Sequence, residues 1–241
     1  MEEKIFCWSN FDNWKTSFAE FIQIVFPDNI FSLIEKHKGS IEGIDWAGQL
    51  EEYVHDDNDN YYYDSEFLQY FKNTYSHLLT FHGCRPSDIL SYYKYGLLVL
   101  DVELQNKYYE KMFLNKNFNK VTLDDFNFAI STLKKEKREN ELYLAIDDKE
   151  LIEFAGHYLI YGSEYIMCLA AILSERIGID YKASLREIGK PTVFKIKLPV
   201  YLVNDKDISH MFKYLFRLWI YNTVHKTNFM KSLDHSFLIK T

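Results

Sequence analysis

Apolar residues recur at three- and four-residue intervals in the first third of the chain, and this spacing predicts helices. From Trp14 to Phe26 they fall on one helical face, until Pro27 interrupts the pattern. A second set, from Phe67 to Tyr75, predicts another helix. The aromatic faces of this region exceed what one isolated helix can bury, so we expect the region to pack on the rest of the chain or on a partner protein.

The pattern changes at residues 78–81, where four apolar or β-branched residues predict a short buried strand. Pro86 follows where a helix can begin, since its missing N–H would be unpaired there in any case, and Gly96 suits the end of that helix. His82 and Arg85 are therefore expected at a strand-to-helix corner, which suits an anionic or ribose-bearing ligand. An ordinary turn with a hydrogen-bonded histidine and a surface arginine explains the same residues.

A second block has the same organisation. Glycines bracket a short aromatic and aliphatic run, so residues 156–161 are predicted to form a strand. Ser163 is a suitable N-cap for the apolar helix that should end near Gly178. Lysines alternate with apolar residues over 192–198, as in a half-buried strand. The pattern also predicts helices within residues 100–147 and 207–226, and a last strand at residues 236–239.

The composition fits a folded protein with a sizeable core, since 47% of the 241 residues are hydrophobic. A formal charge of −7 gives no broad basic surface for duplex DNA, although a local groove could still bind nucleic acid. Cys7, Cys84 and Cys168 are odd in number and widely spaced, which fits a reducing compartment. No segment reaches the roughly 18 apolar residues of a membrane span or resembles a signal peptide, so we expect a cytoplasmic protein that binds no membrane.

A dense acidic run at residues 51–60 superficially suggests a calcium loop. The spacing does not fit, because Tyr61 stands where such a loop needs glycine and the closing glutamate is displaced. We interpret the run as a solvated loop and predict no metal site.

Three motifs together resemble the ADP-ribosyltransferase superfamily: Phe81-His82-Gly83-Cys84-Arg85, then Gly156-His157-Tyr158-Leu159 followed by Ser163, then the alternating strand. In the histidine-tyrosine-glutamate branch of that family, an aromatic-His-Gly-Thr strand end and a Gly-x-Tyr strand form the NAD cleft. The resemblance implies an α+β fold, with a small split β-sheet and flanking helices. That transferase-like domain would span residues 78–241, preceded by a helical N-terminal region at residues 1–77.

The resemblance also implies a role for individual residues. His82 would bind the NAD ribose and the nicotinamide amide, and the backbone of Gly83 would pair with the carboxamide. Tyr158 would pack against the nicotinamide, so we expect Tyr158 and His82 to face one cleft, and opposite faces of the sheet would contradict the transferase interpretation. Arg85, Ser163 and Tyr165 complete the residues expected to contact the cofactor.

The family's third catalytic element is a glutamate at the start of a late strand, and Asp234 stands at the matching position. Cleavage of the nicotinamide–ribose bond develops positive charge on the sugar, which a fixed carboxylate stabilises. Aspartate is shorter than glutamate, so its reach is in question, and Glu164 is the nearest substitute. His82, Tyr158 and Asp234 are thus the predicted catalytic residues.

The function implied is transfer of ADP-ribose from NAD to a protein or nucleic-acid acceptor. The aromatic-rich composition also resembles stand-alone bacterial toxins and phage-defence effectors of this superfamily, which suggests a neutralising antitoxin protein as a partner. A non-catalytic module of the same fold, binding NAD, another nucleotide or a partner, is the alternative that the aspartate favours. A hydrolase that pairs Cys84 with His157 or His82 is a third hypothesis, although neighbours at a tight turn rarely present the geometry for attack.

Overall fold

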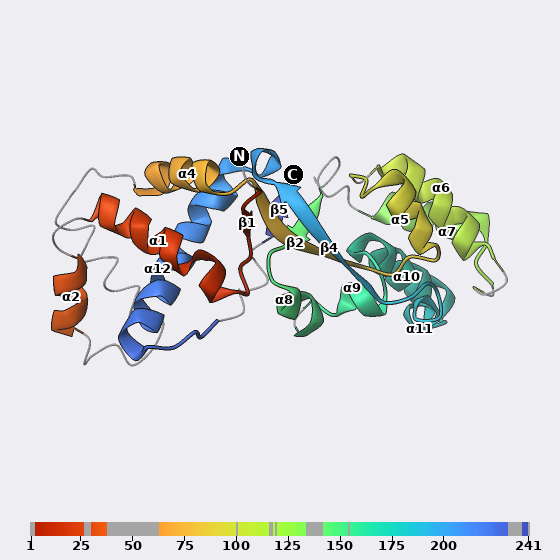
Figure 1. Cartoon of the computed structure of the whole chain (residues 1–241). Helices are drawn as coiled ribbons and strands as arrows, with labels where there is room; N and C mark the ends of the chain where they lie inside the picture. Colours follow the sequence, from red (N-terminus) through yellow and green to blue (C-terminus); the bar gives the residue numbers. More distant parts are fainter. Residues whose placement is uncertain are drawn as a thin grey trace. The chain divides into compact units, whose positions relative to one another are not determined.

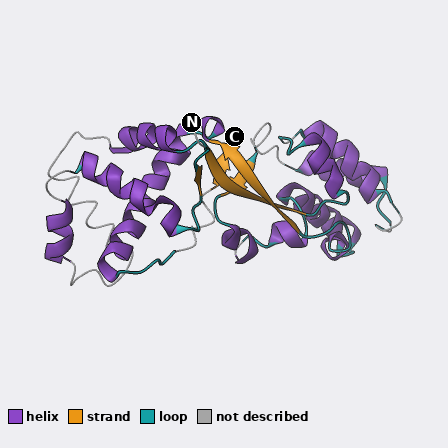
Figure 2. Cartoon of the chain, viewed as in Figure 1, coloured by secondary structure: helices purple, strands orange, loops and turns teal. Residues whose placement is uncertain are grey.

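The computed structural model describes residues 3–26, 30–37, 63–99, 101–115, 118, 120–133, 142–153, 155–230 and 238–240. Most of these residues are helical, and the strands form a small mixed sheet (Figure 2). The expected α+β class is confirmed. The chain divides into two compact units, Met1–Thr80 with Ile196–Lys240, and Phe81–Lys195. This division differs from the predicted domains, because the last part of the chain groups with the N-terminal helices.

The first unit is built on helices from both ends of the chain (Figure 1). In it α12 packs on α4 and on α1, and β1 pairs in parallel with the start of β2 through Ile5 and His77. Its elements are β1 (Ile5–Phe6), α1 (Phe11–Val25), α2 (Ile30–His37), α4 (Tyr63–Thr74), a 3₁₀ turn (Val200–Leu202), α12 (Asp205–His225) and β5 (Leu238–Lys240). β2 (His77–Cys84) begins in this unit, and β4 (Thr192–Pro199) ends in it.

Aromatic rings fill the core of the first unit. Phe18 of α1 contacts Phe67 of α4 and Phe212 of α12, with ring centroids 6.0 and 6.1 Å apart. Phe212 and Phe67 lie 5.4 Å apart and complete the triangle. The apolar face predicted for the first helix is therefore covered by residues of the same chain.

The second unit has a separate helical core, in which α10 packs on α7 and α11. Phe113, Phe126, Leu169, Leu173 and Tyr181 are fully buried there. The elements of this unit are α5 (Ile89–Tyr95), α6 (Val102–Phe113), α7 (Leu123–Thr132), β3 (Tyr143–Ala145), α8 (Asp148–Glu153), α9 (His157–Ile160), α10 (Glu164–Ile177) and α11 (Tyr181–Leu185). β3 pairs antiparallel with β2, Ala145 opposite Phe81, and was not predicted from the sequence.

Local chemistry explains the helix ends. The side chain of Ser163 accepts a hydrogen bond from the Ile166 N–H, and α10 ends at Gly178 in a left-handed conformation with φ of 78°. Helix α5 ends at Gly96, also with positive φ, but begins at Ile89 because Asp88 caps it. Both predicted helices are thus confirmed, although α5 begins three residues later than Pro86, at Ile89.

The predicted strand at residues 156–161 is wrong, because this segment contains the short helix α9. The amides of Leu159 and Ile160 each donate to the Gly156 carbonyl at 3.0 Å, and the amide of Tyr161 donates to the His157 carbonyl at 2.8 Å. These local bonds use the backbone groups that a strand would offer to a neighbour. A short apolar run between glycines fits a buried helical turn as well as a strand, so periodicity alone does not distinguish them.

Candidate functional site

The part of β2 in the second unit presents two different faces. Phe81 and Gly83 are buried, whereas His82 and Cys84 are half-buried. Because successive side chains of a strand point to opposite faces, His82 and Cys84 share one face and Phe81 and Gly83 share the other. We call the first of these the His82 face.

The His82 ring is held in one tautomer. Its Nδ1 atom lies 3.3 Å from the carbonyl oxygen of Tyr143, and a carbonyl only accepts, so Nδ1 must bear the proton. Burial lowers the pKa of His82 below its ordinary value, which keeps the ring neutral at pH 7. The Nε2 atom then has a lone pair, and this arrangement suits a ligand hydroxyl as hydrogen-bond donor.

Tyr158 lies on the other side of the strand. A side chain at Gly83 would come within 3.6 Å of the Tyr158 Cβ and within 3.5 Å of methyl groups of Leu151 and Leu159. Helices α8 and α9 therefore cover the Gly83 face, and alternation directs the His82 ring away from them. The structure does not bring His82 and Tyr158 into one cleft, contrary to our prediction, because the second motif is a helix packed on the opposite face.

Arg85 has a structural role instead of the predicted contact with a cofactor. Its Nε donates to the Ile188 carbonyl at 2.9 Å, and its Nη1 donates to the Leu159 carbonyl at 2.9 Å. Its Nη2 donates to the carbonyls of Arg186 and Gly189, at 2.5 and 3.1 Å. Four backbone acceptors occupy the guanidinium, which ties α9 and the segment before β4 to the end of β2.

Gly189 fits closely beneath this arginine. A Cβ at this position would stand 2.5 Å from the Arg85 carbonyl oxygen and 2.7 Å from that of Pro86, and its φ of +66° is one that side chains disfavour. The next amide, Lys190 N–H, donates to the Pro86 carbonyl at 3.1 Å. The corner predicted as a ligand site is thus partly closed by backbone.

Three tyrosines of the second unit lie close to one another, to a serine and to a cysteine, and we call this group the tyrosine cluster: Cys84, Tyr92, Tyr109, Ser163 and Tyr165. The hydroxyl groups of Tyr109 and Ser163 lie 3.2 Å apart, and the rings of Tyr109 and Tyr165 stack with centroids 6.0 Å apart. Tyr165 donates to Asn106 at 2.6 Å. The predicted residues Ser163 and Tyr165 are therefore brought together.

Tyr92 links this cluster to the His82 face. Its side chain lies near Cys84, and burial, with the neighbouring Cys84, Tyr109 and Tyr108, raises the pKa of Tyr92. Burial also raises the pKa of Tyr109 to about 12. Every phenol in the cluster consequently stays protonated and uncharged at neutral pH.

The cysteine hypothesis receives no support from this environment. Burial raises the pKa of the Cys84 thiol above its ordinary value, whereas a nucleophilic cysteine needs a lowered pKa. His157 belongs to α9, on the side of the strand away from Cys84. We interpret Cys84 as a packing residue beside Tyr92.

Asp234 and the acidic run at residues 51–60 lie outside the described residues. Glu164 is the first residue of α10, half-buried beside the Ser163 cap. Within the described residues, no group of three or more His, Cys, Asp or Glu side chains is arranged to hold a metal ion.

Sequence reasoning missed Tyr92 and Tyr109. Tyr92 lies on the helix after the His-Gly corner and Tyr109 on a helix within residues 100–147, and neither residue was singled out. The signal that could have found Tyr92 is the density of tyrosines just after that corner. Tyr92, Tyr93 and Tyr95 occur within four residues, in a helix with no fully buried side chain. Because no side chain of this helix is fully buried, its tyrosines are not explained by packing in the core.

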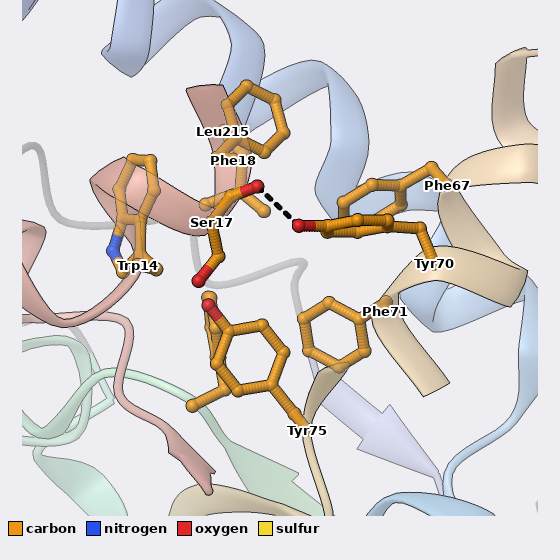
Figure 3. A pocket seen from close by; sticks show the side chains of 9 residues that line it. Trp14, Ser17, Phe18, Phe67, Tyr70, Phe71, Tyr75 and Leu215 are labelled. Atoms are coloured by element: carbon orange, nitrogen blue, oxygen red, sulfur yellow. Dashed lines mark hydrogen bonds between the residues drawn. The ribbon is translucent and has the colours of Figure 1, made fainter. Parts of the chain in front are cut away.

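A small cavity in the first unit is lined by aromatic rings, including Phe71 and Tyr75 (Figure 3). The Tyr70 hydroxyl donates to the Ser17 carbonyl at its edge, at 2.8 Å. The cavity volume that the centre of a water molecule can occupy is ≈ 10 Å³, which is about enough for one water. It is too small for a nucleotide.

Comparison with protein-family models, with curated proteins and with solved structures found no match for this chain. Within the described ranges, no single helix is long and apolar enough to cross a membrane, and one sharply bent pair, α1 with α2, passes that test on length and composition only.

Proposed function

We propose that this chain binds NAD at the His82 face of the second unit and transfers ADP-ribose to a macromolecular acceptor. The observation that supports this most is the His82 ring itself. Its Nδ1–H is fixed on the Tyr143 carbonyl and its Nε2 has no hydrogen-bond partner among the described residues. A neutral imidazole in that state accepts a hydrogen bond from a ribose hydroxyl.

The tyrosine cluster gives a second reason. Ser163 and Tyr165, to which the resemblance assigns contacts with the carboxamide and the nicotinamide ring, meet around Tyr109. Cys84, which shares the His82 face, lies beside Tyr92 of this group. The proposal keeps His82, Gly83, Ser163 and Tyr165 as binding residues, and removes Arg85 and Tyr158.

In the proposed reaction, the bond between C1′ of the ribose and the nicotinamide nitrogen breaks, and nicotinamide leaves with the bonding electrons. An oxygen or nitrogen of the acceptor forms the new bond to C1′ and loses its proton. A carboxylate would stabilise the cationic sugar and take up that proton. Asp234 is the proposed carboxylate and Glu164 the substitute.

The first experiment measures nicotinamide release from NAD by the full chain, with mass spectrometry of modified proteins and nucleic acids. We expect His82→Gln to lower kcat/KM by about tenfold, because the ribose hydroxyl loses a positioned hydrogen-bond acceptor, worth about 1–1.5 kcal/mol. His157→Gln is the matched control, a histidine of the same unit on the opposite side of the strand. Equal activity of His82→Gln and the unmodified chain would reject this site.

A second pair of variants identifies the acid. Asp234→Asn should keep NAD affinity and lose most of the turnover, because an interaction made only in the transition state lowers kcat without weakening substrate binding. Full activity of Asp234→Asn together with loss in Glu164→Gln would assign the role to Glu164. We extend the proposal to a bacterial toxin or defence effector with a neutralising protein, which growth arrest on induction would test.

A non-catalytic binding module is the second candidate. The observation in its favour is that Asp234, shorter than the glutamate of the family that the chain resembles, stands at the position of the catalytic acid. This candidate predicts NAD binding by calorimetry with no nicotinamide release and no labelled acceptor. Turnover abolished by Asp234→Asn or Glu164→Gln would exclude it.

A further inference from the structure

We propose that the exposed apolar side chains of residues 89–108 form the interface of a symmetric dimer, in which this surface of one chain meets the same surface of a second copy. We call it the α5–α6 surface, because its most exposed members on helices are Leu90 and Tyr93 of α5 and Leu104 and Tyr108 of α6. The inference does not depend on the proposed NAD site.

Helix α5 presents most of its apolar residues to solvent. Five of the seven residues of Ile89–Tyr95 are aliphatic or aromatic, but none is fully buried, and 70% of Leu90 and 76% of Tyr93 are exposed. A helix this short is not stable by itself, and most helices are stabilised by burying an apolar face. Tyr92 stacks on Phe194 with centroids 4.7 Å apart, which holds one side of α5. The exposed apolar side chains on the rest of α5 are available to a partner.

Helix α6 continues this surface. Leu104 and Tyr108 are four residues apart, so they lie on one face of α6, and 58% and 51% of them are exposed. The hydroxyl groups of Tyr108 and Ser87 lie 3.2 Å apart. This hydrogen bond places Tyr108 beside the start of α5, where Ile89 and Leu90 lie. The exposed side chains of the two helices therefore belong to one surface.

The exposed apolar area matches that of a dimer interface. Burying a tyrosine removes about 150–250 Å² from water, and burying an aliphatic side chain about half as much. With Tyr95 at the end of α5 and Leu98 and Val99 after it, the surface exposes roughly 450–800 Å². The largest apolar patch of a typical monomer is about 300–600 Å². A standard interface buries about 800 Å² of each partner, about 65% of it apolar in homodimers, and the α5–α6 surface provides that apolar area.

The charges around the surface favour a second copy over other partners. In a two-fold contact each surface meets itself, so charges of one sign would repel, whereas a balanced surface can pair acids with lysines. A nucleic acid would need an excess of lysines, and a strongly basic partner an excess of acids. Among the described residues 88–99 and 101–111, the exposed charged side chains are three acids and three lysines: Asp88, Asp101, Glu103, Lys94, Lys107 and Lys111.

The first test is the mass of the full chain in solution, measured by sedimentation over a range of concentrations. We expect an equilibrium between monomer and dimer. Tyr93→Glu should raise the Kd of the dimer about 10²-fold, the effect of losing a central interface residue, because each copy would bring a carboxylate to the contact. Tyr201→Glu is the matched control, a tyrosine of the first unit that is 80% exposed, and should dimerise like the unmodified chain.

Two further measurements decide the result. Leu104→Glu changes the other helix of the surface and should also weaken the dimer, so it replaces Tyr93→Glu if circular dichroism shows that this variant does not fold. Hydrogen exchange of the unmodified chain should show protection within residues 87–111 only at concentrations where the dimer forms. A chain that stays monomeric, including one that binds a different protein at this surface, overturns the proposal. A dimer that neither Tyr93→Glu nor Leu104→Glu weakens, or that Tyr201→Glu weakens equally, overturns it as well.

Discussion

The core of the first unit and the tyrosine cluster of the second unit use aromatic residues in different ways. In the first unit, rings from α1, α4 and α12 pack on one another, with Phe18, Phe67 and Phe212 almost fully buried. In the second unit, tyrosines near β2 pair through their hydroxyl groups, as Tyr109 does with Ser163. The first arrangement stabilises the fold through buried apolar area, and the second fixes the orientation of hydroxyl groups through hydrogen bonds.

This difference indicates which aromatic residues of an aromatic-rich protein are available to bind a ligand. A ring enclosed by other rings is fully used in stability, and its loss leaves a cavity. A half-buried tyrosine with a paired hydroxyl still has one ring face or edge that another molecule can contact. The abundance of aromatic residues therefore does not indicate a site, whereas their exposure and hydrogen bonding do.

The largest expected effect is on the first unit. Phe212→Ala removes a ring that packs against Phe18, Phe21, Phe67 and Phe216, and should lower the free energy of unfolding by about 3–5 kcal/mol. Denaturant titration measures this change in the free energy of unfolding. Ile24→Ala, on the exposed side of α1, should change stability by less than about 0.5 kcal/mol and serves as the control. Equal effects of the two variants would contradict the description of this core.

In the second unit, the largest effect should come from backbone packing. Gly189→Ala places a Cβ 2.5 Å from the Arg85 carbonyl oxygen at positive φ, so we expect a loss of about 2–4 kcal/mol, from strain and from a disturbed Arg85. Gly178→Ala is the matched control, since its φ is also positive but nothing lies within 4 Å. It should cost about 1 kcal/mol, the conformational term alone. Thermal unfolding of both variants compares them directly.

A smaller effect is expected at the tyrosine cluster. Ser163→Ala removes the N-cap of α10 and the partner of the Tyr109 hydroxyl, and should cost about 1–2 kcal/mol. Ser163→Thr keeps a hydroxyl that can cap the helix, and should restore most of the stability. Hydrogen exchange of the first amides of α10 reports whether the cap was lost. No change in Ser163→Ala would mean that the cluster is not rigid.

The smallest effect concerns pH. Burial holds the pKa of His82 in the folded state below 6.5, its ordinary value, so between these two pKa values the unfolded chain binds more protons. Stability should therefore decrease as the pH falls below about 6.5, until it reaches the lowered pKa. His82→Gln should reduce this pH dependence. Denaturation midpoints measured from pH 8 to pH 5 test it, and an unchanged slope in the variant would show that His82 is not the group responsible.

The candidate site was only partly predictable from the sequence. The strand at residues 78–81 and the helix capped by Ser163 were predicted correctly, because each depends on residues within one turn or one strand, but β2 continues to Cys84, so His82 lies within the strand and not at the predicted corner. The role of Arg85 was not, since its four acceptors lie 74 to 104 residues away in the chain. A sequence motif identifies a basic side chain but not the backbone groups that occupy it.

The sequence by itself determined where most helices and strands of this protein lie, because caps, left-handed glycines and apolar alternation act over a few residues. Only the tertiary structure decided which side of β2 each motif meets. Tyr158 was predicted to join His82, but α9 packs on Gly83, on the opposite face of the strand. The choice of face depends on contacts between distant segments, and these follow from the packing of whole helices against the strand.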